Sequence, residues 1–253
     1  MCIRDSNPIG GIQREGAVLR KDFRSFVGLH PIPLRHGLTC GELAAWMNES
    51  QGIGCDLEVI ECRGWRRSMG WSDTGLPWVA PSPNLPTPES CLVYPGMVLL
   101  EGTNLSEGRG TTKPFEYFGA PYLNIERLLD LLDQERLDGV TIRPCHFEPT
   151  FQKYAGSMCV GGQLHVTDPE TFQPIRTAVT ILRAARELAP QEFGWSKPPY
   201  EYEEDLMPID LLWGHDGLRY RIDDGATVDE VLEGVEEDID TFKDSVSSFL
   251  IYE

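Results

Sequence analysis

The chain has 253 residues, of which 41% are hydrophobic and 25% charged, as is usual for a globular protein of one large domain or two small ones. Its formal net charge of −18 argues against nucleic acid and anionic membrane surfaces as partners, because both attract basic faces. No apolar run approaches the ~20 residues of a membrane span. We therefore expect no nucleic-acid partner and no membrane span, and the oligomeric state stays open.

The first half of the chain is predicted to be rich in loops, because glycine and proline recur as far as about Pro121. Within this half we predict a helix near Thr39 to Glu49 and a strand near Leu57 to Cys62. Thr39 and Glu42 have the spacing of a capping box, in which each side chain bonds to the backbone of the other residue. Glu42 is therefore interpreted as a helix cap and not as a catalytic group.

The second half has a more regular pattern of apolar residues. Asn124 is expected to cap a helix that stops near Gly139. Val140 to Phe147 and Gln163 to Val166 are predicted strands. The second half is thus expected to contain both helices and strands.

Two further helices are predicted toward the C-terminus. Pro174 is expected to open an amphipathic helix, since proline is tolerated at the first helical position. Thr227 and Glu230 form a second capping box. Apolar residues continue at helical spacing from there almost to the end of the chain, so we predict one helix over this stretch.

Seven cysteines are spread along the chain at irregular spacings: Cys2, Cys40, Cys55, Cys62, Cys91, Cys145 and Cys159. Neither a CxxC pair nor a zinc-type cluster of cysteine and histidine occurs in the sequence. We therefore expect incidental or buried thiols, no metal site and no cofactor. The cysteines do not indicate a redox compartment.

The stretch from Glu101 to Thr112, which we call the motif loop, combines carboxylates, an arginine, an amide, hydroxyls and three glycines. Glycines allow tight turns and the close approach of a ligand, and loops often carry binding groups. We interpret the motif loop as a polar ligand site; the alternative is a tight loop whose polar groups bond to their own backbone. A phosphate loop is rejected, because five residues separate Gly102 from Gly108 and no lysine follows.

Three charged side chains of the motif loop are candidates for chemistry. Glu101 and Glu107 could act as acid and base, because two carboxylates in different environments can hold different protonation states. Alternatively, either could pair with Arg109 or cap a helix. Arg109 could bind a carboxylate through two parallel hydrogen bonds, or form a salt bridge within the protein.

Two other regions offer candidate binding groups. Arg35 and His36 precede the first predicted helix, whose N-terminus favours anions. His36 could be an acid, a base or a sugar contact, or it could be a structural histidine. Three tryptophans lead into a proline-rich segment that contains Ser82 and Asn84: Trp65, Trp71 and Trp78. Their flat faces suit sugar rings, but core packing explains them without any ligand.

Several rigid motifs stand out along the chain: Asn7-Pro8-Ile9-Gly10-Gly11, Pro31 to Thr39 with Gly41-Glu42-Leu43, Asp73 to Trp78, Pro81 to Pro86, and Leu100 to Thr112 with Pro114-Phe115. Together they resemble the exo-β-N-acetylmuramidase family of bacterial glycoside hydrolases, from Asn7 to the C-terminus. The resemblance implies removal of terminal N-acetylmuramic acid (MurNAc) from the non-reducing end of peptidoglycan fragments. It also implies an α/β fold, made of the remainder of a Rossmann-like domain and a smaller α+β auxiliary domain, with the active site in the cleft between them.

The resemblance also implies how the chain is divided. Residues 1–6 are expected to be a non-native lead-in, residues 7–120 the C-terminal part of the Rossmann-like domain, and residues 121–253 the auxiliary domain. Family members carry a further N-terminal segment with a Ser-Pro-Glu-His-Gly motif, whose glutamate is the favoured catalytic acid. This sequence has no Glu-His pair, so we expect a fragment that is inactive alone. Peptidoglycan as substrate implies a periplasmic or secreted location.

The family's substrate gives the candidate residues their roles. The lactyl carboxylate of muramic acid would need Arg109 or Arg35, and Glu107 or Glu101 would be the second carboxylate of a glycosidase. The candidate substrate-binding residues are Arg109, Asn104, Ser106, Thr111, Thr112, Asn84, Ser82, Arg35 and His36. The alternative function is a non-catalytic module that binds muropeptides or polysaccharides, and a weaker one is a hydrolase of amides or esters.

Overall fold

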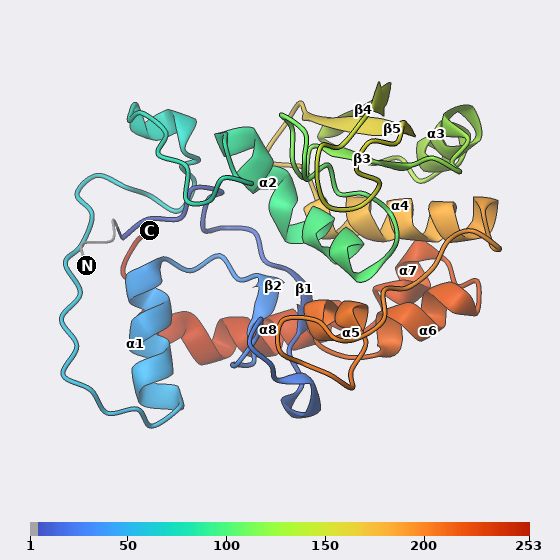
Figure 1. Ribbon diagram of the computed structural model, residues 1–253. Coiled ribbons are helices and arrows are strands. Elements are labelled where there is room, and N and C mark those ends of the chain that lie inside the picture. Colours follow the sequence, from blue (N-terminus) through green and yellow to red (C-terminus); the bar gives the residue numbers. More distant parts are fainter. Residues whose placement is uncertain (1–4) are drawn as a thin grey trace.

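Helix α4 (Pro174–Leu188) lies at the centre of the larger hydrophobic core, and its predicted start at Pro174 is confirmed. The computed structural model describes residues 5–253 (Figure 1). Helix α2 (Pro88–Met97) packs directly on α4, because Gly96 lies against the carbonyl of Pro174, where any side chain would collide. Apolar burial of this kind supplies most of the stability of a small domain.

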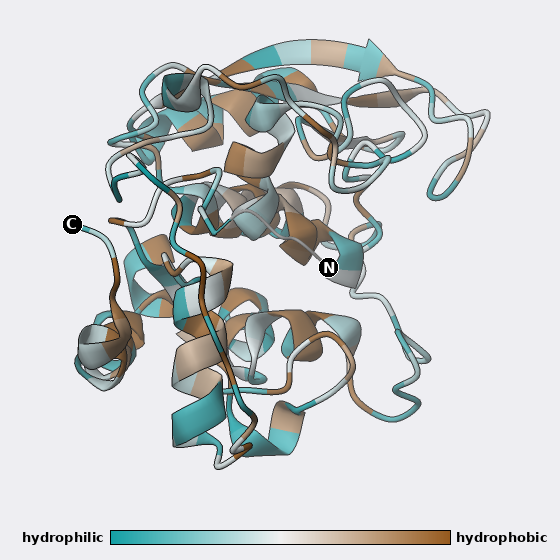
Figure 2. Ribbon diagram, turned by 90° about the vertical axis from the view of Figure 1, so that its left-hand side faces the viewer, coloured by the Kyte–Doolittle hydropathy of each residue, from teal (hydrophilic) through white to brown (hydrophobic). Residues whose placement is uncertain are grey.

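A three-stranded antiparallel sheet covers one side of α4. Its order is β3 (Tyr117–Ala120), β5 (Cys159–Val166) and β4 (Val140–Phe147), and α3 (Ile125–Gln134) packs beside it. The predicted strand over 140–147 is confirmed, and the sheet lies at the top of the molecule in Figure 2. Strand β5 begins four residues earlier than predicted.

Strand β5 was predicted too short because two glycines interrupt its apolar pattern. Gly161 lies so close to the carbonyl of Phe118 that a Cβ would collide with it. Gly162 lies against the ring of Phe118 in the same way. These glycines allow β3 to approach β5, and such close approach is a common reason for glycine within a strand.

The smaller core joins the N-terminal and C-terminal parts of the chain. Strands β1 (Glu15–Val18) and β2 (Pro33–Arg35) form an antiparallel pair, and α8 (Val235–Val246) packs against β1. Helix α1 (Cys40–Ser50) begins at the predicted capping box, where Thr39 and Glu42 bond to each other's backbone. The buried residues of this core are Leu38, Trp46, Phe242 and Val246.

Three short helices lie on the other side of α4: α5 (Pro208–Trp213), α6 (Gly217–Asp223) and α7 (Val228–Val231). The capping box of Thr227 and Glu230 is confirmed. The single long helix predicted after it is wrong, because α7 ends after four residues and α8 starts only at Val235. Gly234 between them has a φ of 84°, a left-handed conformation that stops a helix.

The strand predicted near Leu57 to Cys62 is also wrong. The segment pairs with no strand among residues 5–253. Leu57 and Ile60 are 39% and 74% exposed. The apolar residues of this segment have no neighbouring strand to pair with, and without such a partner an alternating pattern does not form a strand.

Mixed helices and strands confirm the α/β prediction. Both sheets formed by residues 5–253 are antiparallel, whereas a Rossmann-like sheet is mostly parallel. The larger core takes residues from both sides of the boundary predicted at residue 120, including Leu99 and Ile175. The two-domain division stays a prediction, and the lead-in at residues 1–6 falls mostly outside the described residues.

Three other features of residues 5–253 bear on the predictions. The six cysteines in this range are free thiols, and Cys2 lies outside the described residues. Burial raises the pKa of Cys91 and of Cys159 to about 11. Among the described residues there is no cluster of metal-ligating side chains, and no helix there is long and apolar enough to cross a membrane.

Candidate functional site

The motif loop follows α2 through a 3-10 helix, η3 (Val98–Gly102), which carries Glu101. The loop then runs beside β3, where Ser106 and Gly119 exchange backbone hydrogen bonds of 2.8 and 3.0 Å. Gly108 and Gly110 have positive φ values of 77° and 81°, and a Cβ at either would collide with neighbouring backbone. The glycines of the loop are thus required for its packing, and the loop is held on both sides.

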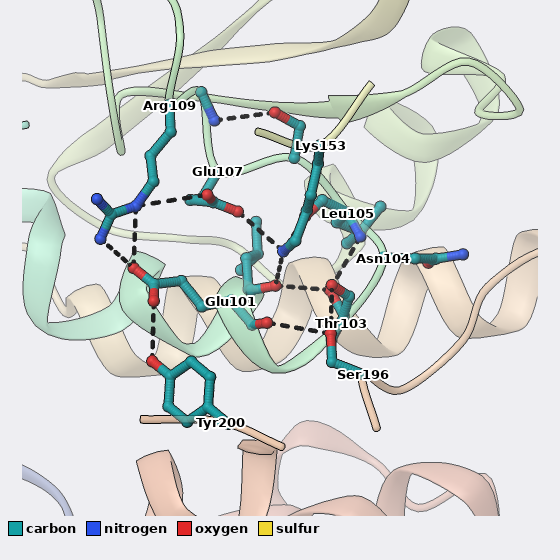
Figure 3. Close-up of polar contacts among 12 residues, drawn as sticks. Glu101, Thr103, Asn104, Leu105, Glu107, Arg109, Lys153, Ser196 and Tyr200 are labelled. Atoms are coloured by element: carbon teal, nitrogen blue, oxygen red, sulfur yellow. Dashed lines mark hydrogen bonds and ion pairs between the residues drawn. The ribbon is translucent and has the colours of Figure 1, made fainter. Parts of the chain in front are cut away.

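A chain of alternating charges runs along the motif loop (Figure 3). Arg109 places Nη2 2.6 Å and Nε 3.2 Å from Oε1 of Glu101. The same Nε lies 3.6 Å from Oε1 of Glu107. On the far side, Nζ of Lys153 lies 2.9 Å from Oε2 of Glu107. Two carboxylates and two cations thus neutralise one another.

Lys153 holds the motif loop from the outside. Besides Glu107, its ammonium group donates to the carbonyls of Leu100 and Leu105, each at 2.8 Å. All three of its protons are therefore used. Burial lowers the pKa of Lys153, although the charge of Glu107 acts in the opposite direction. The sequence prediction missed this residue, because 46 positions separate it from Glu107 and no local pattern links them.

Of the two carboxylates Glu101 and Glu107, Glu101 reaches the surface of a cavity of about 450 Å³. Its Oε2 accepts a hydrogen bond of 2.9 Å from the hydroxyl of Tyr200, and its side chain is 15% exposed. Burial, followed by the charge of Glu101, raises the pKa of Tyr200 and of Tyr94. Both tyrosines line the cavity, and the sequence prediction named neither of them.

Arg109 also lines the cavity, with a quarter of its side chain exposed. Its guanidinium lies 5.1 Å from the centre of the Phe115 ring. Burial alone would lower the pKa of Arg109, but hydrogen bonding and the charges of Glu101 and Glu107 raise it overall. Within residues 5–253 its Nη1 makes no hydrogen bond, so one edge of the guanidinium remains available to a ligand.

Two histidines, His30 and His36, also line the cavity. Nδ1 of His36 accepts a hydrogen bond of 3.0 Å from the backbone of Leu38, so a neutral ring carries its proton on Nε2. Burial, followed by the charge of Arg14, lowers the pKa of His36 to about 4, which makes the ring neutral at pH 7. Nδ1 of His30 is buried without a partner among the described residues. Buried polar atoms of this kind usually have a partner, and a ligand in the cavity would supply one.

Several other candidate residues contact the protein itself. Arg35 is 4% exposed and pairs with Glu15 at 2.8 Å, outside the cavity. The amide nitrogen of Asn104 donates to the carbonyl of Glu192 at 2.7 Å, and its oxygen accepts from Tyr122. Arg35 thus holds Glu15 and the carbonyl of Ile9, and the side-chain amide of Asn104 is used by contacts within the protein.

The remaining hydroxyl and amide candidates lie in local turns and do not line this cavity. Ser106 accepts a hydrogen bond from the backbone of Gly108, and Thr111 donates to the carbonyl of Gly108. Thr112 is exposed. The hydroxyl of Ser82 accepts from the backbone of Asn84 at 3.3 Å, which closes a turn in the proline-rich segment. Substrate contacts by these residues stay predictions.

A carboxylate, an arginine and aromatic rings around one concave site are features of saccharide-binding proteins, glycoside hydrolases among them. The chain belongs to the exo-β-N-acetylmuramidase NamZ family. The family model of the N-terminal domain matches residues 1–89, and that of the C-terminal domain matches residues 92–252. The family predicted from the sequence motifs is thereby confirmed.

A curated relative and two solved structures are similar to the whole chain. The peptidoglycan β-N-acetylmuramidase NamZ of Bacillus subtilis (strain 168) is 41% identical over 252 residues, which cover 100% of this chain and 59% of the relative. A DUF1343 family protein of Bacteroides fragilis NCTC 9343 has a TM-score of 0.85 at 30% identity, covering 98% of this chain and 64% of its own. A second one has a TM-score of 0.75 at 25% identity, covering 98% and 65%. The chain thus spans about three fifths of the length of its curated relative.

Proposed function

We propose that this chain forms one wall of the active site of an exo-β-N-acetylmuramidase, which removes terminal MurNAc from the non-reducing end of peptidoglycan fragments. The observation that carries the proposal is the pair Glu101 and Arg109 on the cavity surface, in a chain of this family. A periplasmic or secreted location is part of the proposal and rests on peptidoglycan as the substrate.

Glu101 is suited to stabilise positive charge on the substrate. Its carboxylate accepts hydrogen bonds from Arg109 and Tyr200 on both oxygens, so it is presented as an acceptor and not as a proton donor. Glycosidases pass through a transition state with oxocarbenium character, and a carboxylate on one face of the sugar lowers its energy. The proton for the leaving oxygen is then supplied by another group, for which the family's glutamate outside this sequence is our candidate.

Glu107 has a supporting role in this proposal. Its side chain is 3% exposed and lies between Lys153 and Arg109, away from the cavity surface. It orients the guanidinium of Arg109 and does not contact the substrate. Of the two carboxylates in the motif loop, we therefore assign the direct role to Glu101.

Arg109 and His36 are suited to recognise the sugar's substituents. The free Nη1 edge of Arg109 can bind the lactyl carboxylate that distinguishes muramic acid from glucosamine. The neutral ring of His36 can donate from Nε2 to a hydroxyl or acetamido oxygen. Both side chains line the same cavity, whose volume of about 450 Å³ lies in the usual range for small-molecule sites of ~300–1,000 Å³.

The test joins residues 7–253 to the preceding segment of the B. subtilis relative and measures MurNAc release from a MurNAc-GlcNAc disaccharide (GlcNAc is N-acetylglucosamine). We expect release by the chimaera, and a loss of about 10²-fold or more in Glu101→Gln, which keeps the shape of the side chain. Glu89→Gln is the matched control, since Glu89 is exposed at the start of α2. A folded chimaera that binds the disaccharide without cleaving it would favour the non-catalytic binding module.

A further inference from the structure

Two short turns face each other at the mouth of the cavity. The first is closed by backbone hydrogen bonds of 2.9 and 3.2 Å between Ser25 and Gly28, and it carries Phe26. The second is closed by bonds of 2.8 and 2.9 Å between Tyr200 and Glu203, and it carries Tyr202. The two aromatic rings meet edge to face, with their centres 5.3 Å apart. We call Phe26 and Tyr202 the aromatic rim.

The rim is exposed although it is built from large aromatic side chains. Phe26 is 70% exposed and Tyr202 is 88% exposed, and Leu29, which follows the first turn in the sequence, is 60% exposed. Glu201 and Tyr202 also have positive φ values of 46° and 69°, a conformation that residues other than glycine rarely adopt. The ring of Tyr202 is thus presented to solvent instead of being packed inside.

The rim is continuous with the proposed active site. Phe26 and Glu201 line the same cavity as Glu101 and Arg109. Tyr200 connects the two regions, because its hydroxyl bonds to Glu101 and it lies two residues before Tyr202. A ligand that extends from Glu101 toward Glu201 and Phe26 therefore reaches the aromatic rim.

We infer that the aromatic rim binds the second sugar ring of the substrate, the one that leaves when terminal MurNAc is removed. This inference rests on the proposed function. An enzyme that acts on the terminal residue holds that residue in the cavity, so the next ring lies at the mouth. A pyranose has apolar C–H faces that match aromatic rings, and hydroxyl groups on its edge that can donate to the carboxylate of Glu201.

The charge at the mouth favours an uncharged ring. Glu201 lies on the tip of the second turn, and the chain as a whole carries a net charge of −18. A second anionic sugar would be repelled there, whereas GlcNAc has no charge. The terminal residue would bind through Arg109, and the next residue through apolar contact and hydrogen bonds.

The test compares two ligands, MurNAc and the MurNAc-GlcNAc disaccharide, binding to the 253-residue chain by calorimetry and saturation-transfer NMR. In the unaltered chain we expect saturation of the GlcNAc protons and tighter binding of the disaccharide. Phe26→Ala with Tyr202→Ala should weaken disaccharide binding about three- to tenfold, the worth of one aromatic contact, and leave MurNAc binding unchanged. Phe26→Trp with Tyr202→Trp should retain the preference. Ile60→Ala, at a site 74% exposed and outside the cavity, is the control.

Each alternative result would contradict one specific part of the argument. If the unaltered chain and the double alanine variant bind the disaccharide equally well, the rim does not bind the second sugar ring, and the proposed function still stands. Rim-dependent binding of the disaccharide combined with no cleavage by the chimaera would overturn the proposed function and leave the rim as a sugar site. If the unaltered chain binds neither ligand, or if the alanine variant only abolishes self-association in sedimentation, the rim is not a saccharide site.

Discussion

The β1–β2 pair and the motif loop each hold an arginine against a carboxylate, but they expose it differently. Arg35 is 4% exposed and bonds to Glu15, whose other oxygen accepts from the backbone of Ile175 at the start of α4. Arg109 bonds to Glu101 with a quarter of its side chain exposed on the cavity. The first pair joins three elements of the fold, whereas the second leaves one edge free for a ligand. The same residue types thus serve structure in one region and recognition in the other.

The largest effect is expected from breaking the buried pair of the β1–β2 region. Arg35→Met leaves Glu15 buried without its cation, and burial already raises the pKa of that carboxyl. The free energy of unfolding should fall by about 3–5 kcal/mol, measured by urea denaturation.

The matched control replaces both members of that pair. Arg35→Met with Glu15→Leu removes the unpaired charge and should recover most of the lost stability, because a buried pair and apolar residues of similar volume are often equivalent. A single variant as stable as the unaltered chain would show that the pair contributes nothing to the fold.

A smaller but still substantial effect is expected at Lys153. Lys153→Met keeps the length of the side chain and removes three hydrogen bonds, which leaves Glu107 with Arg109 alone. The free energy of unfolding should fall by about 2–3 kcal/mol, less than for Arg35 because Lys153 is 24% exposed. In the chimaera, kcat should also fall because Arg109 and Glu101 lose their support. If Lys153→Met lowers the stability but leaves kcat unchanged, Lys153 stabilises the fold and does not position Arg109 and Glu101.

Arg109→Ala should affect recognition more than stability. In the chimaera, kcat/KM for the muramyl substrate should fall about tenfold or more, as expected for lost charge-assisted hydrogen bonds worth about 1.5–3 kcal/mol. The glucosaminyl analogue lacks the lactyl carboxylate and should be affected much less. Arg109→Lys keeps the positive charge but cannot form two parallel hydrogen bonds, so it should restore only part of the loss. Equal losses on both substrates with a lower Tm would make Arg109 a structural residue like Arg35.

The sequence predicted elements well where the signals were local. The capping boxes at Thr39 and Thr227 involve residues three positions apart, and both are confirmed. Helix α2 went unrecognised because Pro95 lies within it. The isolated strand pattern near Leu57 was misleading because strand formation depends on a distant partner.

The candidate site was predictable in the same partial way. The sequence placed His36, Glu101 and Arg109 among the candidates, and all three line one cavity. It could not identify Lys153 or Tyr200, which lie 46 and 99 residues from their partners. The sequence also could not show that Arg35 is structural and that Arg109 is exposed to a ligand. The difference between the two arginines is their burial, which is a property of the folded chain.

The smallest effect is expected from the pH dependence of His36. Its folded-state pKa of about 4 lies below the ordinary value of 6.5, so between these values the unfolded chain binds more protons. Stability is therefore fully present above pH 6.5 and is lost as the pH falls toward 4. From pH 7.5 to pH 6 the contribution of His36 should be about 1 kcal/mol, and His36→Gln should remove it from the difference between urea unfolding curves at the two values. His215, whose pKa burial also lowers to about 4, is the matched comparison on the helical side of the molecule. If His36→Gln leaves the difference unchanged while His215→Gln reduces it, the ring of His36 is accessible to protons in the folded chain, and its role as a neutral donor in the cavity fails.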